Sequence, residues 1–95
     1  MQRYYYKNKK IVLNLDNQLT EIKSKEEEFS TLSIINNSEE DIYIIEKAEN
    51  EDVDTSSGTL LGAGKMLSYD YVPKNAVYIS TESINEITVL VKYSE

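Results

Sequence analysis

From residue 31 to its end, the chain alternates short runs of strand-forming residues with turn signals, and this pattern constrains the fold more than any other feature. Asparagine, serine, glycine and proline, which favour tight turns, separate the runs. Short strands at this spacing are typical of a sandwich or a small barrel. With one more strand over 10–15, we predict a single all-β domain: a small β-sandwich or partly open barrel of about seven short, mainly antiparallel strands. The runs from residue 31 on are 31–36, 41–45, 58–62, 65–71, 76–80 and 84–93.

Several runs place an apolar residue at every second position, which gathers these residues on one face of a strand. The cleanest alternation lies in residues 86–93, whereas 41–45 is apolar on both faces. The run 66–71 places Leu67, Tyr69 and Tyr71 on one face, where we expect them to pack across the sheet. Val77 and Ile79 are predicted to face inward. In the other runs the alternation groups these residues on one face of each strand: Ile11, Leu13 and Leu15; Leu32 and Ile34; and Ile87, Val89, Val91 and Tyr93.

Residues 19–29 are ambiguous between two local structures. Ser24 and Glu27 have the spacing of a helix capping box, which would fit one helical turn. The stretch lacks a sustained apolar stripe, however, and 25–28 is a charged run typical of a solvated loop. We therefore predict a short strand followed by a loop. The polar, acidic stretch 46–57 is likewise predicted to be an exposed loop.

The composition limits the chemistry that this chain can perform. It has 95 residues, enough for one domain, and it contains neither histidine nor cysteine. Disulfides, thiolate metal sites and serine–histidine catalysis are therefore excluded. The acidic residues occur in runs typical of solvated loops. The chain is predicted to be non-enzymatic and to use no cofactor.

Two glycine- or acid-containing loops suggest ligand sites at first sight. The stretch 49–58 departs from the calcium-binding loop pattern, because its glycine and its final acidic ligand are misplaced, so an irregular cation site there stays open. The step 62–65 resembles a phosphate-binding loop but has Thr59 and Met66 where glycine and serine or threonine are required. We interpret the first as a solvated loop and the second as a turn.

Charge divides the chain into a basic beginning and an acidic remainder. Residues 1–10 carry four basic and no acidic residues (+4), and residues 11–95 carry six basic and 17 acidic residues (−11), which together give −7. An acidic body repels a phosphate backbone, so we expect no binding of nucleic acid by it. No apolar run approaches the roughly 20 residues of a membrane span. No signal peptide is visible either, which predicts a cytosolic protein at synthesis.

We therefore predict two parts: a basic, tyrosine-rich arm over 1–10 and one β domain over 11–95. A basic arm on an acidic body suits docking onto an acidic neighbour, including a second copy of the chain. Tyrosine is also favoured at protein interfaces. The alternative is a solvated terminus without a partner. The predicted partner-binding residues are Arg3, Tyr4, Tyr5, Tyr6, Lys7, Lys9 and Lys10.

Short motifs follow one another in a fixed order along residues 31–93. The sequence Asn36-Asn-Ser separates a strand from one carrying Ile42-Tyr-Ile, and Ser57-Gly58 opens the next turn. The pattern closes with Ala76-Val-Tyr-Ile-Ser and the valine-rich strand 87–91. This order resembles that of small bacteriophage virion proteins; the resemblance covers residues 31–93, and the acidic insertion at 46–57 departs from it.

The resemblance implies a small β-sandwich that serves as a minor structural or decoration protein of a phage head, neck or fibre. Its expected partners are other virion proteins (capsid, portal or fibre), and it would form a homo-oligomer or a symmetric array. The expected location is the virion, and the host cytoplasm during assembly. Two alternatives stay open: a carbohydrate- or receptor-binding module of a phage fibre, and an intracellular regulatory or inhibitor protein.

Overall fold

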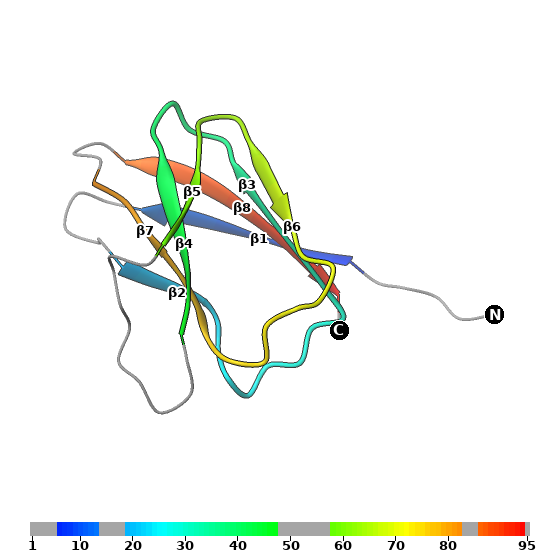
Figure 1. The fold of residues 1–95 in the computed structure, drawn as a ribbon. Helices are drawn as coiled ribbons and strands as arrows, with labels where there is room; N and C mark the ends of the chain where they lie inside the picture. The colour runs from blue at the N-terminus through cyan, green and yellow to red at the C-terminus, as the bar shows by residue number, and fades with distance from the viewer. Residues whose placement is uncertain (1–5, 14–18, 48–57, 83–85, 95) are drawn as a thin grey trace.

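The computed structural model describes residues 6–13, 19–47, 58–82 and 86–94, and the regular structure within these ranges consists of strands (Figure 1). In this part of the chain, no helix is long and apolar enough to cross a membrane. The eight strands are β1 (Tyr6–Leu13), β2 (Leu19–Lys23), β3 (Thr31–Asn36), β4 (Ile42–Glu46), β5 (Thr59–Leu61), β6 (Met66–Ser68), β7 (Val77–Ser80) and β8 (Ile87–Ser94).

The strands form two antiparallel four-stranded sheets. Sheet A has the order β1-β8-β3-β6, and sheet B has the order β2-β7-β4-β5. The first strand pairs with the eighth, the second with the seventh, the third with the sixth and the fourth with the fifth. The chain is thus one long nested hairpin, rolled up so that β8 also pairs with β3 and β7 with β4. This is the strand order of a jelly roll.

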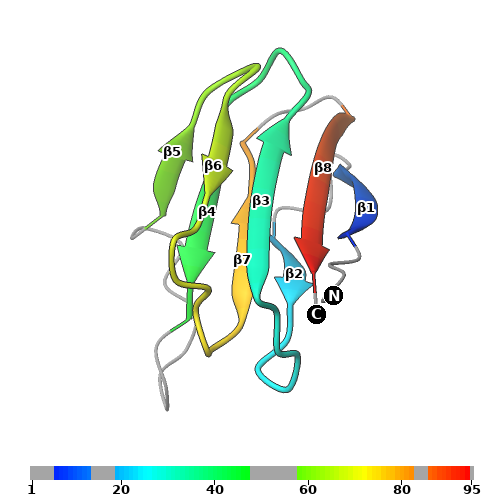
Figure 2. The ribbon, with the colours of Figure 1, turned by 90° about the vertical axis from the view of Figure 1, so that its right-hand side faces the viewer.

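The predicted all-β fold is therefore confirmed, with two separate sheets rather than a partly open barrel. Figure 2 shows the strands of both sheets running along one common direction, with the connecting loops at the two ends. The loops 37–41 and 62–65 lie at one end, and the loops 24–30 and 69–76 lie at the other.

The core lies between the sheets and is built from the alternating aliphatic residues of both. The predicted alternation is confirmed: Ile34, Val89 and Val91 from sheet A have no exposed surface, and neither do Val77 and Ile79 from sheet B. Leu15 lies outside the described residues. The rest of the core cluster consists of Ile11, Leu13, Leu32, Ile87, Ile22, Ile42, Ile44 and Leu61.

The strand-then-loop prediction for residues 19–29 is also confirmed. β2 ends at Lys23, and the Ser24–Glu27 pair forms its contact in a single turn between strands. The Ser24 N–H donates to the Glu27 carboxylate over 2.9 Å, and the Glu27 N–H donates to the Ser24 carbonyl over 3.3 Å. The capping-box spacing thus closes a loop here and does not begin a helix.

The prediction that Tyr71 shares a strand face with Leu67 and Tyr69 is wrong. β6 ends at Ser68, because it pairs with β3 only over Ser33–Ile35. Tyr69 adds one more ladder bond, from its N–H to the Leu32 carbonyl over 3.0 Å, and then the chain leaves the sheet. Tyr71 is consequently 92% exposed in the β6–β7 loop.

β1 begins earlier than the apolar alternation suggests. Residues 6–10 pair with β8 in one continuous ladder that runs from Tyr6 opposite Ser94 to Leu13 opposite Ile87. Backbone pairing explains this, since an edge strand needs few apolar side chains when its neighbour supplies the hydrogen bonds. The boundary that we placed between residues 10 and 11 falls inside β1.

Asn36 joins the two loops at one end of the sandwich. Its side chain has no exposed surface. Its Nδ2 donates to the Glu40 carbonyl over 2.7 Å and to the Leu61 carbonyl over 3.0 Å. Its Oδ1 accepts from the N–H of Ser38 over 3.1 Å and from the Ser38 hydroxyl over 2.6 Å. The β3–β4 loop is therefore bonded to the end of β5 through one amide.

Candidate functional site

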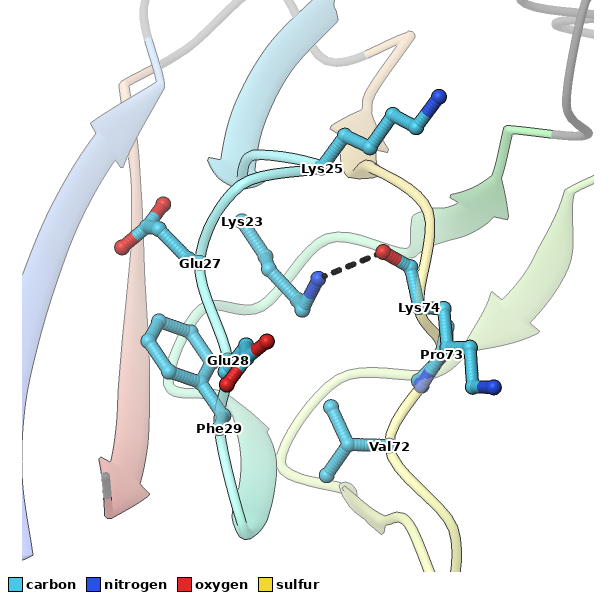
Figure 3. Close-up of a pocket in the computed structure, with 8 residues that line it drawn as sticks. All are labelled: Lys23, Lys25, Glu27, Glu28, Phe29, Val72, Pro73 and Lys74. Carbon is cyan, nitrogen blue, oxygen red and sulfur yellow. Dashed lines mark hydrogen bonds between the residues drawn. The ribbon is translucent and has the colours of Figure 1, made fainter.

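A pocket of about 380 Å³ opens between the β2–β3 loop and the β6–β7 loop (Figure 3). Phe29, Val72 and Pro73 supply its apolar part. Five charged residues, Lys23, Lys25, Glu27, Glu28 and Lys74, complete the lining. A pocket of this size with mixed lining is the first place to look for a ligand site.

The lysine deepest in this pocket is already fully bonded. Lys23 is 1% exposed, and its ammonium donates to the carbonyls of Ser24 over 3.0 Å and of Lys74 and Asn75 over 3.3 Å each. Figure 3 shows the bond to the Lys74 carbonyl. An ammonium has three protons, so all of its donors are used. Lys23 therefore holds the β6–β7 loop against β2 and has no donor left for a ligand.

A bulge explains why a lysine is buried here. The pairing of β2 with β7 shifts between Glu21 and Lys23, so that Ile22 and Lys23, adjacent in sequence, are both buried. A bulge of this kind re-aims a side chain that regular alternation would send to the other face.

Two further residues of the pocket, Phe29 and Glu27, also make contacts within the fold. The Phe29 ring stacks on Tyr93, with ring centroids 4.2 Å apart and an interplanar angle of 17°. The Glu27 carboxylate accepts the bond from Ser24 described above. The pocket therefore lies where two loops meet, and its deepest polar group, the Lys23 ammonium, is already hydrogen-bonded. We assign the pocket a structural role.

Tyr69 makes a second link, between the two sheets. It follows β6 of sheet A, and its hydroxyl is hydrogen-bonded to Glu46, the last residue of β4 in sheet B. Burial, followed by the negative charge and the hydrogen bond of Glu46, raises the pKa of Tyr69 well above its ordinary value of 10.0. The neutral phenol is therefore the form that the fold requires.

This link predicts a pH dependence in the alkaline range. Because the pKa of Tyr69 is higher in the folded than in the unfolded state, its contribution to stability is complete below about pH 10 and declines as the pH rises further. The Tyr69→Phe protein should therefore lose less stability between pH 9 and 11 than the wild type does, as measured by thermal unfolding. Tyr71→Phe, which removes a hydroxyl from an exposed ring, should behave like the wild type; equal slopes for all three proteins would contradict the assignment.

Sheet A differs in charge from the rest of the chain. Its four strands, all within the described residues, carry four lysines and no acidic residue: Lys7, Lys9 and Lys10 on β1 and Lys92 on β8. The strands of sheet A thus contribute +4, and the rest of the chain contributes −11 to the total of −7. All four lysines are exposed.

The outer face of sheet A also carries an apolar row. The pairing register places Lys10, Leu90, Ile35 and Met66 side by side across all four strands. Leu90 and Ile35 are half-buried, whereas Met66 is 62% exposed and Val12, in the neighbouring row on β1, is 42% exposed. We call this surface the sheet A face; its residues are Asn8, Lys10, Val12, Thr31, Ser33, Ile35, Met66, Ser68, Thr88, Leu90 and Lys92.

Of the predicted partner-binding residues whose side chains are described, Lys10 alone belongs to the sheet A face. Lys7 and Lys9 also lie on β1, but they alternate to the other side of the strand. The backbone of Tyr6 begins β1, while Arg3, Tyr4 and Tyr5 lie outside the described residues. Sequence reasoning missed Lys92, Leu90, Ile35 and Met66. Ile35 and Leu90 left a signal, since each is an apolar residue between two inward-facing positions.

Acidic residues gather at the end of the sandwich that Asn36 organises. Glu39, Glu40, Asp41, Glu82 and Glu86 line two shallow hollows there. Among the described residues, no group of three or more acidic side chains is placed to hold a metal ion. The cation site considered for 49–58 falls, apart from Gly58, outside the described part of the chain.

Comparison with known proteins yields no relative for this chain. No family model, no curated protein and no solved structure matches it. The jelly-roll assignment therefore rests on the strand order, and functional arguments rest on the surfaces described above.

Proposed function

We propose that this chain is a non-enzymatic structural protein that docks onto an acidic surface of a larger particle through the sheet A face. The observation that carries the proposal is the separation of charge, with lysines and no acids on the strands of sheet A in a chain whose remainder is strongly acidic. Opposite charge on a partner would steer the encounter and set its orientation.

The apolar row supplies what charge alone does not. Leu90, Ile35 and Met66 form a continuous aliphatic strip on this face. Removing this strip from water on docking would contribute a favourable free energy of about 25 cal/mol per Å² of apolar area buried. Lys10 and Lys92 stand beside this strip. An apolar centre with a charged rim is the usual arrangement of a protein interface.

We further propose that the particle is a bacteriophage virion and that the chain is one of its minor or decoration proteins, located in the virion. Two observations support this: the resemblance of residues 31–93 to small virion proteins, and the jelly-roll strand order, which occurs in viral capsid domains. The non-enzymatic role is supported by the absence of histidine and cysteine from the sequence and by the full bonding of Lys23.

Carbohydrate binding is the second candidate, because jelly rolls also include lectins. It is favoured by Tyr71, which is 92% exposed directly before Val72 and Pro73 of the pocket lining. An exposed ring of this kind can stack on a sugar. Binding of the isolated protein to a glycan array, abolished by Tyr71→Ala, would favour this function over docking.

Charge reversal tests the docking role directly. The double variant Lys10→Glu/Lys92→Glu inverts the sheet A face, and the control Lys25→Glu/Lys74→Glu makes the same change in charge at the loop end. We expect the first pair to lower incorporation into purified particles, measured by quantitative mass spectrometry, by at least about tenfold, equivalent to about 1.4 kcal/mol. The control should incorporate normally.

Both double variants alter exposed side chains, so their thermal unfolding should match that of the wild type. Equal incorporation of both would refute docking through sheet A. Selective loss in the control would move the docking site to the pocket. Absence of the wild-type protein from all particles would refute the virion assignment.

A further inference from the structure

The outer face of sheet B carries an apolar row of its own. The register places Leu19, Ser80, Tyr43 and Leu60 side by side across its four strands. Leu19 is 37% exposed and Leu60 is 56% exposed. We call this surface the sheet B face; its accessible residues are Leu19, Glu21, Tyr43, Leu60, Tyr78 and Ser80. Ile45, opposite Tyr78, lies on the same side but is only 1% exposed, and Gly58 packs closely against it.

Exposed aliphatic residues are distributed evenly between the two faces. Among the described residues, the aliphatic side chains with the largest exposure are Val12 and Met66 on sheet A and Leu19 and Leu60 on sheet B. Each of the four lies on an outermost strand of its sheet. Exposed aliphatic side chains therefore lie at both edges of each sheet, although Lys10 occupies the β1 position of the sheet A row and Ser80 lies within the sheet B row.

The two faces carry opposite charge. Lys10 and Lys92 lie on the sheet A face, whereas Glu21 lies on the sheet B face, where it accepts a hydrogen bond from the Tyr78 hydroxyl over 3.0 Å. Asp41 and Glu82 add negative charge beside Tyr43 at the end of sheet B. Two sheet A faces would oppose lysine to lysine, while a sheet A face and a sheet B face complement each other.

We propose that the sheet A face of one copy packs against the sheet B face of a second copy, so that the chain associates head to tail. This inference rests on the docking role proposed for sheet A and names its partner. Such a contact uses two different surfaces, so each copy keeps one face free for the next. Repetition then produces a ring or a filament, according to whether the rotation between copies closes.

Pairing through strand edges is disfavoured by the same residues. β1 is an eight-residue outermost strand, and edges of this length invite the addition of another strand. Three exposed lysines on β1, at positions 7, 9 and 10, oppose this because a second β1 would bring like charges together. The charges of β1 therefore disfavour pairing of this edge with a second β1.

The size of the faces sets the strength of the contact. The strands of sheet A hold 25 residues and those of sheet B hold 17. With about 3.4 Å of rise per residue and about 4.8 Å between strands, the smaller set, in sheet B, gives a face of roughly 280 Å². A standard stable interface covers about 800 Å² per partner. We therefore expect weak association, visible at roughly 100 μM and above, which repeated placement in a particle would strengthen by avidity.

The test is sedimentation velocity of the purified full chain over a concentration series. The weight-average mass of the wild type should rise with concentration. Lys92→Glu alone and Glu21→Lys alone should each stay monomeric, because each opposes like charges. An equimolar mixture of the two variants, and the double variant Lys92→Glu/Glu21→Lys, should associate again. Glu26→Lys, an exposed loop change, should behave like the wild type.

Wild-type protein that stays monomeric at all concentrations would overturn the inference, and so would association that neither single variant weakens. A monomeric wild type whose incorporation into particles still depends on Lys10 and Lys92 would leave the docking role intact with another partner. If the wild type self-associates as expected but its incorporation into particles does not depend on Lys10 and Lys92, the self-association stands and the docking role is refuted.

Discussion

Replacement of Asn36 by alanine is expected to lower the free energy of unfolding by about 3–4 kcal/mol. The side chain is fully buried and makes four hydrogen bonds, to the Glu40 and Leu61 carbonyls and to the N–H and hydroxyl of Ser38. Alanine leaves the Leu61 carbonyl and the Ser38 N–H without their partner, at about 1–3 kcal/mol for each one that water cannot reach, whereas the Ser38 hydroxyl and the Glu40 carbonyl keep the 3.0 Å bond between them. The Leu61 carbonyl is the most costly, because its bond is buried.

The neighbouring residue supplies a matched control. Asn37 is exposed, so Asn37→Ala removes the same side chain from the same loop and should change stability by less than about 0.5 kcal/mol. Asn36→Asp keeps the acceptor for Ser38 but loses both donated bonds, and it should destabilise at least as much as alanine because it also buries a charge. Urea unfolding measures all three. A cost below about 1 kcal/mol for Asn36→Ala would show that Asn36 is not the link between the loops.

Asn36 also shows where sequence reasoning reached its limit. The stretch 36–38 has a turn composition, and a turn does follow β3. Composition could not reveal that the amide points between the sheets toward Leu61, because that contact spans 25 residues and depends on where β5 lies. Local signals predict strands and turns, whereas the partner of a polar side chain is set by tertiary pairing.

The same distinction applies to the sheets. The alternating faces of β7 and β8 follow from a pattern within a few residues, and they were predicted correctly. The order β1-β8-β3-β6 joins strands from opposite ends of the chain, and no periodicity encodes it. Alternation therefore determines which side chains are buried, while the jelly-roll order becomes visible only in the structure.

The distribution of charge differs most between what the sequence suggests and what the structure shows. Along the sequence, the basic residues fall in 1–10 and read as an arm. In the structure, Lys7, Lys9 and Lys10 belong to β1, and Lys10 shares the outer face of sheet A with Lys92, which follows more than 80 residues later, whereas Lys7 and Lys9 alternate to the other side of β1. The acid-free layer is thus a property of sheet A as a whole, and it is this layer, together with its apolar row, that supports docking.

Lys23 gave no sequence signal, since a lysine after a strand in a charged segment is typical of a solvated surface. The bulge between Glu21 and Lys23 reverses that expectation. Its ammonium is bonded to one carbonyl of its own loop and two of the β6–β7 loop, so the interaction crosses 51 and 52 residues of chain. This buried lysine therefore links the two loops by hydrogen bonds.

Lys23→Met should therefore lower the free energy of unfolding by about 2–4 kcal/mol. Methionine has similar length and volume but donates no hydrogen bond. Each hydrogen bond from a charged donor contributes about 1.5–3 kcal/mol to stability. The variant loses three of them, but it no longer has to bury a charge, and this offsets part of the loss. The β6–β7 loop should be affected most, because Lys74 and Asn75 lose the donor that ties them to β2.

The matched control is Lys25→Met, which makes the same substitution two residues away on an exposed side chain and should change stability by less than about 0.5 kcal/mol. Urea unfolding gives the global effect, and limited proteolysis within residues 69–76 reports on the loop. Faster cleavage there in Lys23→Met than in Lys25→Met is expected, because the loop is held from one side by this ammonium. If the Lys23→Met protein is as stable as the wild type, the cost of burying the charge equals the gain from its three hydrogen bonds. The link that Lys23 makes between the loops would then contribute no net stability.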